Sequence, residues 1–196
     1  MSELEKPAHE HNYEVKDNPL NPAPPEILRE ITGVEVIYMN NHDGGETTGF
    51  IEVHESLADD VRKFFARALE IGFPIDKVET ASNPKYYHED ERLMQYNVTS
   101  GFNYRTIAGT NKPSMHALGR AIDVNPKLNP YTKYDSDGNV IETKPEGAVY
   151  DPDRNAGTLT ADHELVILMK ELGWEWGGDW TPESGRVDLH HFQKPA

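Results

Sequence analysis

The chain has 196 residues, enough for one domain with a real core, and no cysteine, which excludes disulfides and thiolate zinc sites. Its 34 Asp and Glu residues outnumber 19 Lys and Arg residues, for a formal charge of −15. This balance argues against nucleic acid or an anionic membrane surface as a partner, because either would need a basic patch.

The N-terminal segment is polar and rich in proline. Residues 1–25 lack the basic and apolar pattern of a signal peptide, so we expect an extended tail followed by a single domain over 26–196. No stretch approaches the ~18 consecutive apolar residues of a membrane helix, and we expect no membrane insertion. We expect a monomer that is either extracytoplasmic, after removal of a leader, or released by lysis; a cytoplasmic location is the alternative.

A short helix and a β-hairpin are predicted after the tail. Pro25 suits the first turn of a helix over 26–31. Residues 34–38 and 49–53 alternate and are rich in β-branched and aromatic side chains, and the Asp-Gly-Gly run at 43–45 suits a turn between two paired strands.

Two later segments have the spacing of amphipathic helices. Ser56 is an N-cap candidate for a helix over 56–71 that ends at Gly72. A second helix is predicted over 162–172, ended by Gly173. Their apolar stripes predict core contacts; the residues are Leu57, Val61, Phe64, Phe65, Ala68 and Leu69 in the first helix, and Leu165, Leu168, Met169 and Leu172 in the second.

The segment 125–157 is long and rich in Pro, Gly, Asn and Asp. Its run Asp-Ser-Asp-Gly-Asn at 135–139 suggests a calcium loop, but the helix that should follow such a loop is spoiled by Pro145. A hairpin turn on Asp137 and Gly138 fits better. Loops of this length are often functional, so we expect this one to frame a cleft.

Two separated clusters combine histidine with aspartate. His116 and Asp123 lie in the run Ser-Met-His-Ala-Leu-Gly-Arg-Ala-Ile-Asp, and residues 188–192 read Asp-Leu-His-His-Phe. A catalytic zinc takes three nitrogen or oxygen ligands from the protein and a water. His116, Asp123 and one of the two late histidines would supply the three.

The spacing within the first cluster requires a bend. On one continuous helix His116 and Asp123 would lie about 10 Å apart along the axis, too far for one metal ion. Gly119 is the candidate bend, because glycine tolerates a positive φ. Asp123 would then lie on a strand over 121–125, on the face opposite Ile122.

The late cluster leaves two registers open. If residues 188–191 form a strand, Asp188 and His190 share a face. If they form a helical turn or a bend, Asp188 and His191 do. The spacing alone does not decide which histidine faces the metal.

The two motifs together resemble those of a known enzyme family. Ser-x-His-x-x-Gly-x-Ala-x-Asp followed by Asp-x-x-His-Phe is similar to the zinc D-alanyl-D-alanine carboxypeptidases, the VanY-like peptidoglycan peptidases, and to their L,D-endopeptidase relatives. The likeness extends to 99–105 and to the tryptophan-rich 173–180, and so covers roughly residues 34–193. It implies one zinc ion held by His116, Asp123 and His191, with Asp188 as the base.

Four other side chains are candidates for the site, the first two of them by the same resemblance. Arg105 would stabilise the oxyanion of the intermediate, a task that suits a fixed guanidinium. Ser114 would bind the substrate, with a helix cap as the alternative. Trp176 and Trp180 would line the substrate cleft, with core packing as the alternative.

We therefore predict an α+β fold, with a small antiparallel sheet bearing the zinc site and flanked by the two helices. The predicted function is zinc-dependent hydrolysis of peptidoglycan stem peptides, first of all at D-Ala-D-Ala, with Arg120 or a backbone N–H as anchor of the terminal carboxylate. Two alternatives stay open. One is an L-Ala–D-Glu endopeptidase of the endolysin type; the other is a zinc-stabilised binding module, which would need neither Asp188 nor Arg105.

Overall fold

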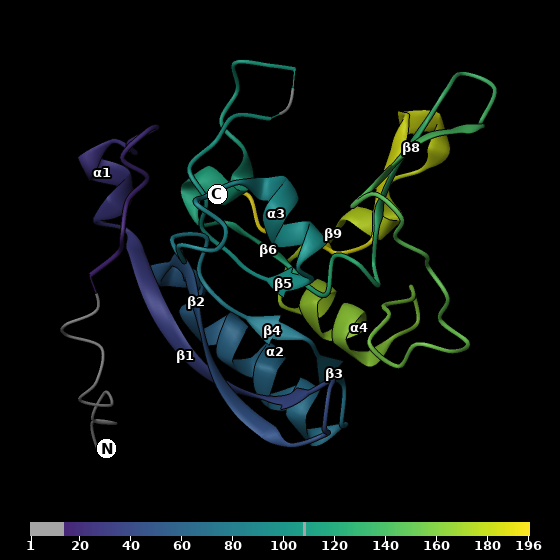
Figure 1. Ribbon diagram of the computed structural model, residues 1–196, viewed down its shortest axis with the longest axis horizontal. Coiled ribbons are helices and arrows are strands. Elements are labelled where there is room, and N and C mark those ends of the chain that lie inside the picture. Colours follow the sequence, from purple (N-terminus) through teal and green to yellow (C-terminus); the bar gives the residue numbers. More distant parts are fainter. Residues whose placement is uncertain (1–13, 108) are drawn as a thin grey trace.

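The structure, a computed structural model, describes residues 14–107 and 109–196. In this part of the chain, helices surround small sheets, three of them three-stranded and one two-stranded (Figure 1). The α+β class predicted from the sequence is confirmed. No helix among these residues combines the length and apolar character that a membrane crossing requires.

The first sheet is built on a long hairpin. The short helix α1 (Pro25–Leu28) leads into β1 (Ile31–Asn40), which pairs antiparallel with β2 (Glu46–His54). On its other side β1 lies parallel to β3 (Pro74–Ile75). Gly44 has a φ of 71° in the turn, a conformation that favours glycine. The predicted hairpin is confirmed, and its strands extend beyond the predicted limits.

The described end of the predicted tail is folded onto the domain. Val15 and Ala23 pack with Ile31 and Phe102. The carboxylate of Asp17 accepts hydrogen bonds from the backbone N–H groups of residues 18 and 23. Residues 14–25 are therefore a packed strap, whereas residues 1–13 of the predicted tail lie outside the described residues.

Helix α2 (Ala58–Glu70) packs against the hairpin with the predicted apolar stripe buried, except Leu69, which is partly exposed (Figure 1). Its start differs from the prediction, because a 3-10 turn, η2 (Glu55–Leu57), precedes it. Nδ1 of His54 accepts a hydrogen bond from the N–H of Ser56, at 3.2 Å. The last residue of β2 already has the extended backbone that an N-cap needs, so the predicted Ser56 cap is wrong.

Helix α4 (Glu164–Glu171) is the second predicted helix, and it packs on α2 and on the sheet that carries the site. It begins two residues later than predicted, because His163 caps it. Nδ1 of His163 accepts a hydrogen bond from the N–H of Leu165, at 3.2 Å. Burial lowers the pKa of His163 against the opposing charges of Glu164 and Asp162.

The cap at His163 predicts an acid-sensitive contribution to stability. A lowered pKa means that the folded state binds the proton more weakly than the unfolded chain does, so the contribution is present above pH 6.5 and is lost as the pH falls through the folded-state pKa. His163→Asn keeps a capping side chain but does not titrate. We expect the free energy of unfolding to fall less between pH 7 and pH 5 in this variant than in the wild type, measured by urea denaturation. An equal fall would contradict the assignment.

The remaining strands bring the second half of the chain together. β6 (Ala121–Asp123), β11 (His191–Gln193) and β9 (Glu175–Trp176) form an antiparallel sheet in the order β6-β11-β9. The two-stranded sheet pairs β4 (Lys77–Val78) with β5 (Val98–Thr99) in parallel. The other helices are short: α3 (Asp90–Gln95), η3 (Met115–Leu118), η4 (Gly177–Asp179) and η5 (Pro182–Ser184).

The long segment 125–157 contains a hairpin of its own. β7 (Tyr131–Tyr134) pairs with β8 (Val140–Lys144), and β10 (Arg186–Asp188) adds to the free edge of β7. Oδ1 of Asp135 accepts hydrogen bonds from the backbone N–H groups of residues 137 and 139, which closes the turn. The predicted hairpin turn is confirmed. The segment also has a structural task, since it holds the strand that ends in Asp188.

One main core joins the two halves of the described chain. It contains the inward faces of α2 and α4, the hairpin β1–β2, and side chains of the site-bearing sheet. The rings of Phe64 on α2 and Phe192 on β11 lie 6.1 Å apart, centroid to centroid. Because β11 packs directly on this core, the residues next to Phe192 have fixed positions.

Candidate metal site

The first cluster folds as a tight turn into a strand. His116 lies in η3 (Met115–Leu118), whose N-cap is Ser114; the Ser114 Oγ accepts a hydrogen bond from the His116 N–H at 3.3 Å. Gly119 follows with a φ of 63° and reverses the chain, so that β6 starts at Ala121. The predicted bend at Gly119 is confirmed.

Gly119 also fills a place where a side chain does not fit. A Cβ at this position would lie 2.5 Å from both the backbone nitrogen of His54 and Cδ1 of Ile31. Gly119→Ala is therefore expected to destabilise the fold by more than the roughly 1–2 kcal/mol that a left-handed residue costs. Gly138→Ala is the matched control, because Gly138 has a φ of 82° and open space around it. Similar losses in urea denaturation would show that the close packing at Gly119 is unimportant.

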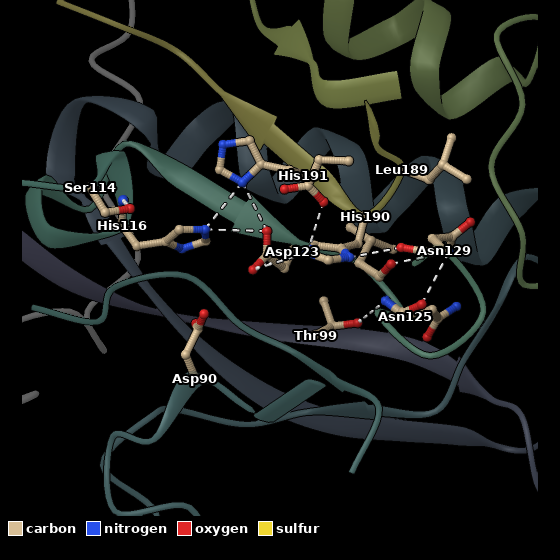
Figure 2. A network of polar contacts seen from close by, with 12 residues as sticks. Asp90, Thr99, Ser114, His116, Asp123, Asn125, Asn129, Leu189, His190 and His191 are labelled. Atoms are coloured by element: carbon tan, nitrogen blue, oxygen red, sulfur yellow. Dashed lines mark hydrogen bonds and ion pairs between the residues drawn. The ribbon is translucent and has the colours of Figure 1, made fainter. Parts of the chain in front are cut away.

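Three side chains converge behind this turn, pointing toward one another in Figure 2. Asp123 and His191 are directly paired across β6 and β11, which places both side chains on one face. Nε2 of His116 lies 3.2 Å from Nδ1 of His191 and 3.2 Å from Oδ1 of Asp123. Nδ1 of His191 lies 3.0 Å from the same Asp123 oxygen. All three residues are buried.

Neighbouring groups orient both imidazoles. Nδ1 of His116 lies 2.7 Å from the carbonyl oxygen of Gly101, which can only accept, so this nitrogen carries the hydrogen. Nε2 of His191 lies 3.1 Å from Oε1 of Gln193, whose amide in turn donates to Glu175 at 2.7 Å. When the rings are neutral, the nitrogens that face the Asp123 oxygen are those with the lone pairs; without a metal ion, the Asp123 carboxylate outweighs burial and raises the pKa of His191.

The converging atoms fit a metal ion. Ligand atoms about 2.0–2.2 Å from a tetrahedral zinc lie roughly 3.3–3.6 Å from one another, close to the spacing observed. Two lone pairs and a carboxylate oxygen repel one another unless a proton or a metal ion lies among them. Outer hydrogen bonds from ligand histidines to carbonyl and amide oxygens are typical of metal sites. His116, Asp123 and His191 therefore have the chemistry and the geometry to hold zinc.

The carboxylate at the centre of this group stays ionised. Burial alone would raise the pKa of Asp123, but the imidazoles of His116 and His190 more than offset burial and hold its pKa well below the usual value. An ionised carboxylate without a hydrogen is the form that binds a metal ion.

The late cluster is neither one strand nor a helical turn; it is the expected bend, between two strands. β10 ends at Asp188, a turn contains Leu189 and His190, and β11 begins at His191. Nε2 of His190 lies 3.0 Å from Oδ1 of Asp188, and its Nδ1 lies 2.7 Å from the carbonyl oxygen of Asn129. His190 thus contacts the predicted base, and His191 joins the group that could hold a metal ion.

Burial opposes protonation of His190, but nearby carboxylates favour it. The charges of Asp188 and Asp123 outweigh the effect of burial and raise the pKa of His190 to about 10. Both ring nitrogens then donate, one to the Asn129 carbonyl and one toward Asp188. Its partners separate its role from that of His191: the two nitrogens of His190 face Asp188 and the Asn129 carbonyl, whereas Nδ1 of His191 lies among the converging donor atoms.

The sequence relationships agree with this geometry. The chain matches the D-alanyl-D-alanine carboxypeptidase family. The match covers residues 108–194, which include the three converging residues and Asp188, and it confirms the resemblance over a shorter span than the motifs suggested. No curated protein and no solved structure is significantly similar to the chain. The family match supports a zinc-dependent peptidase that acts on peptidoglycan.

A segment outside the carboxypeptidase match also contacts the site. Residues 99–105 run beside both halves of the first cluster. Ser100 exchanges two backbone hydrogen bonds with Asp123, and the Asn103 N–H donates to the His116 carbonyl. The carbonyl of Arg105 accepts a hydrogen bond from the N–H of Ser114. The likeness that the sequence suggested at 99–105 therefore coincides with structural contact.

The Arg105 side chain is held by α3. Its Nη2 lies 3.0 Å from Oδ1 of Asp90, and Figure 2 shows the Asp90 carboxylate directed toward the His116–Asp123 pair. The Nε of Arg105 is buried and has no hydrogen-bond partner among the residues that the structure describes. One N–H of this guanidinium is therefore still available to an acceptor.

The two tryptophans predicted for the cleft lie in different surroundings. Trp176 is 3% exposed, its ring lies 6.5 Å from that of Phe192, and its indole N–H donates to the carbonyl of Leu189. This core position leaves no surface for a substrate; its hydrogen bond holds the turn after Asp188. Trp180 is partly exposed, with its ring centroid 5.6 Å from that of His191.

Arg120 does not have the surroundings of a substrate anchor. Its Nε donates to the carbonyl of Lys194 at 2.8 Å, and its Nη2 donates to the carbonyl of Pro195. The guanidinium fastens the C-terminal segment after β11. The expectation that Arg120 anchors a substrate carboxylate is replaced by this structural role.

Several groups at the site were not found from the sequence. Gln193 lies two residues after His191 on the same strand, so strand alternation was a usable signal for it. Asp90 is brought in by the start of α3, Asn129 by the turn that follows β6, and the Gly101 carbonyl belongs to the backbone. Nothing in their local sequence indicates contact with a metal site.

Proposed function

We propose that the protein is a zinc-dependent carboxypeptidase that removes the terminal D-alanine from peptidoglycan stem peptides. The observation that supports it most is the convergence of the His116, Asp123 and His191 donor atoms next to the strand that ends in Asp188. Because the substrate belongs to the cell wall, we propose that the protein acts outside the cytoplasm or after lysis.

In this proposal His116, Asp123 and His191 hold the metal ion. When bound, zinc would polarise the scissile carbonyl and lower the pKa of a water molecule toward neutrality. The carbonyl of Gly101 and the amide of Gln193 keep the two imidazoles in the required orientation. The buried position of the three ligands limits competition from bulk water.

Asp188 is the proposed general base. It accepts a proton from the attacking water and delivers it to the leaving amine. The contact with His190 and the pairing of β10 with β7 support this role, because they fix the carboxylate in position. Gly177 allows the close packing, since a Cβ there would lie 2.4 Å from the Asp188 carbonyl oxygen.

Arg105 is the proposed stabiliser of the oxyanion, and Ser114 a proposed substrate contact. The ion pair with Asp90 orients the guanidinium, and the unpartnered Nε offers a donor to a developing negative charge. The Ser114 oxygen already accepts the hydrogen bond that caps η3, so the donor that remains is its hydroxyl hydrogen. Trp180 stays a proposed wall of the cleft, whereas Trp176 does not.

The test uses stem pentapeptides and the zinc-loaded protein. A pentapeptide ending in D-Ala-D-Ala is expected to release free D-alanine, and the same peptide ending in L-alanine is expected to stay intact. Fragments identified by mass distinguish the other candidates. Cleavage only between L-Ala and D-Glu would establish the endopeptidase, and tight binding without any cleavage would establish the binding module.

A further inference from the structure

An arginine next to the site has no assigned role. The guanidinium carbon of Arg186 lies 4.8 Å from the ring centroid of Trp180, a cation–π stack. The same tryptophan ring lies 5.6 Å from the ring of His191, centroid to centroid. Trp180 therefore bridges a positive charge and the metal-binding group.

Strand geometry places Arg186 with the proposed base. Arg186 and Asp188 are two residues apart on β10, so their side chains share a face and their Cα atoms lie roughly 6–7 Å apart. Tyr131 on β7 is directly opposite Asp188. Burial raises the pKa of Tyr131, and the charge of Arg186 opposes that rise. Arg186 is thus close enough to affect the pKa of Tyr131, the residue paired with Asp188 across the two strands.

Arg186 also differs from the other arginines near the site. Arg105 pairs with a carboxylate, and Arg120 binds backbone carbonyls. Arg186 is exposed and has no carboxylate partner among the residues that the structure describes. The chain has a formal charge of −15, so a positive charge held against an aromatic ring beside the site contrasts with the negative charge of the protein as a whole. Such a positive charge suits an anionic ligand.

We propose that Arg186, positioned by Trp180, binds the free α-carboxylate of the residue that hydrolysis releases. The inference rests on the proposed function, because it takes Asp188 to be the group that protonates the leaving amine. The α-carboxylate is attached to the same carbon as that amine, so it lies on the side of Asp188. A guanidinium two residues before Asp188 on the same face has the reach and the charge to bind it in a bidentate manner.

This assignment has a consequence for specificity. A C-terminal D-alanine has a free α-carboxylate, and so does an internal D-glutamate that is linked through its γ-carboxyl. The interior of an ordinary α-linked peptide has none, because each α-carboxyl is consumed in an amide. Arg186 would therefore select for the unusual linkages of stem peptides, at whichever of the two bonds the protein cuts.

The experiment measures binding, so that it is independent of turnover. Zinc-loaded Asp188→Asn protein keeps the peptides uncut, and calorimetry gives the Kd of three ligands. They are a stem pentapeptide ending in D-Ala-D-Ala, its C-terminal carboxamide, and the pentapeptide with D-isoglutamine in place of D-glutamate. We expect the first to bind about 10- to 100-fold more tightly than one of the two amides, as for a charged hydrogen-bonded pair.

The variants decide whether Arg186 causes that preference. Adding Arg186→Gln should abolish it, and Arg186→Lys should keep part of it. Arg154→Gln is the charge-matched control, because Arg154 is an exposed arginine whose ion-pair partner is Asp151, in the segment after β8. A preference against the C-terminal amide identifies the terminal carboxylate as the ligand, and a preference against isoglutamine identifies that of D-glutamate.

Two outcomes would overturn the inference: equal affinity for all three peptides, or a preference that survives Arg186→Gln. Failure of the proposed function is seen separately, in the hydrolysis assay with the zinc-loaded wild type. If the wild type cuts the pentapeptide but the binding preference is absent, the proposed function is retained and the role of Arg186 is rejected. If the binding preference depends on Arg186 but the wild type hydrolyses no peptide, the role of Arg186 in binding is retained and the proposed function is rejected.

Discussion

Asp188→Asn is expected to lower the rate of stem-peptide hydrolysis by about 10²–10⁴-fold, the usual contribution of general acid–base catalysis. The amide has nearly the same shape as the carboxylate but does not take up a proton from water at neutral pH. Asp188 lies outside the group of three converging donor atoms, so the variant should still bind about one zinc per chain. Released D-alanine and bound zinc are measured on the same preparation.

The control for this variant is Asp179→Asn. Asp179 pairs with Lys170 on the surface, and the substitution makes the same change in charge. It should leave the rate within about twofold of the wild type, since exposed ion pairs contribute little. Full activity of Asp188→Asn would reject the proposed base and favour a different catalytic group. Loss of zinc from Asp188→Asn would instead show that Asp188 is a ligand.

The second large effect concerns the two adjacent histidines. His191→Ala and His116→Ala should each reduce bound zinc from about one ion per chain to nearly none, because each removes one of three protein ligands. His190→Ala should keep the zinc, because Nε2 of His190 lies 3.0 Å from Asp188 but 3.9 Å from Asp123, and its Nδ1 faces the Asn129 carbonyl, so His190 supplies none of the three converging donor atoms. Elemental analysis after gel filtration in metal-free buffer gives the zinc content.

A loss of fold is distinguished from a loss of ligand by thermal denaturation. Added zinc should raise the Tm of the wild type and of His190→Ala, because a ligand that binds only the folded state stabilises it. It should leave the Tm of the His191→Ala variant unchanged. Zinc loss from His190→Ala with retention in His191→Ala would reverse the assignment of the two histidines.

The parts of the fold that follow from local sequence were predictable. The apolar stripe of α2 depends only on helical spacing, and the β1–β2 hairpin depends on strand alternation around Gly44. The bend at Gly119 followed from the distance between two ligands of one metal. Each of these features is set by residues close together in the chain.

Helix starts were less predictable, because the caps are histidines. His54 and His163 accept the hydrogen bonds that serine, threonine or aspartate usually accept. A histidine acts as a cap only when the preceding backbone is extended and its ring stays neutral. The end of β2 provides the extended backbone for His54, and burial against Phe73 keeps the ring of His163 neutral by lowering its pKa.

In the site, too, some residues could be predicted from the sequence around them, and others depend on contacts across the fold. Spacing proposed His116 and Asp123 but did not separate His190 from His191, because the chain makes a turn between two strands at that point. The pairing of β11 with β6 decides which histidine faces Asp123. The surroundings of Trp176, Trp180 and Arg120 depend on contacts across the fold, and no pattern within their own segments indicates them.

The most direct test of this account is a crystal structure of the zinc-loaded protein with anomalous data collected at the zinc absorption edge. The account predicts one strong anomalous peak, bonded to Nε2 of His116, Oδ1 of Asp123 and Nδ1 of His191, with Asp188 nearby but not bonded to the metal. A peak bonded to His190 or Asp188, or no peak among these side chains in protein that contains zinc, would contradict it.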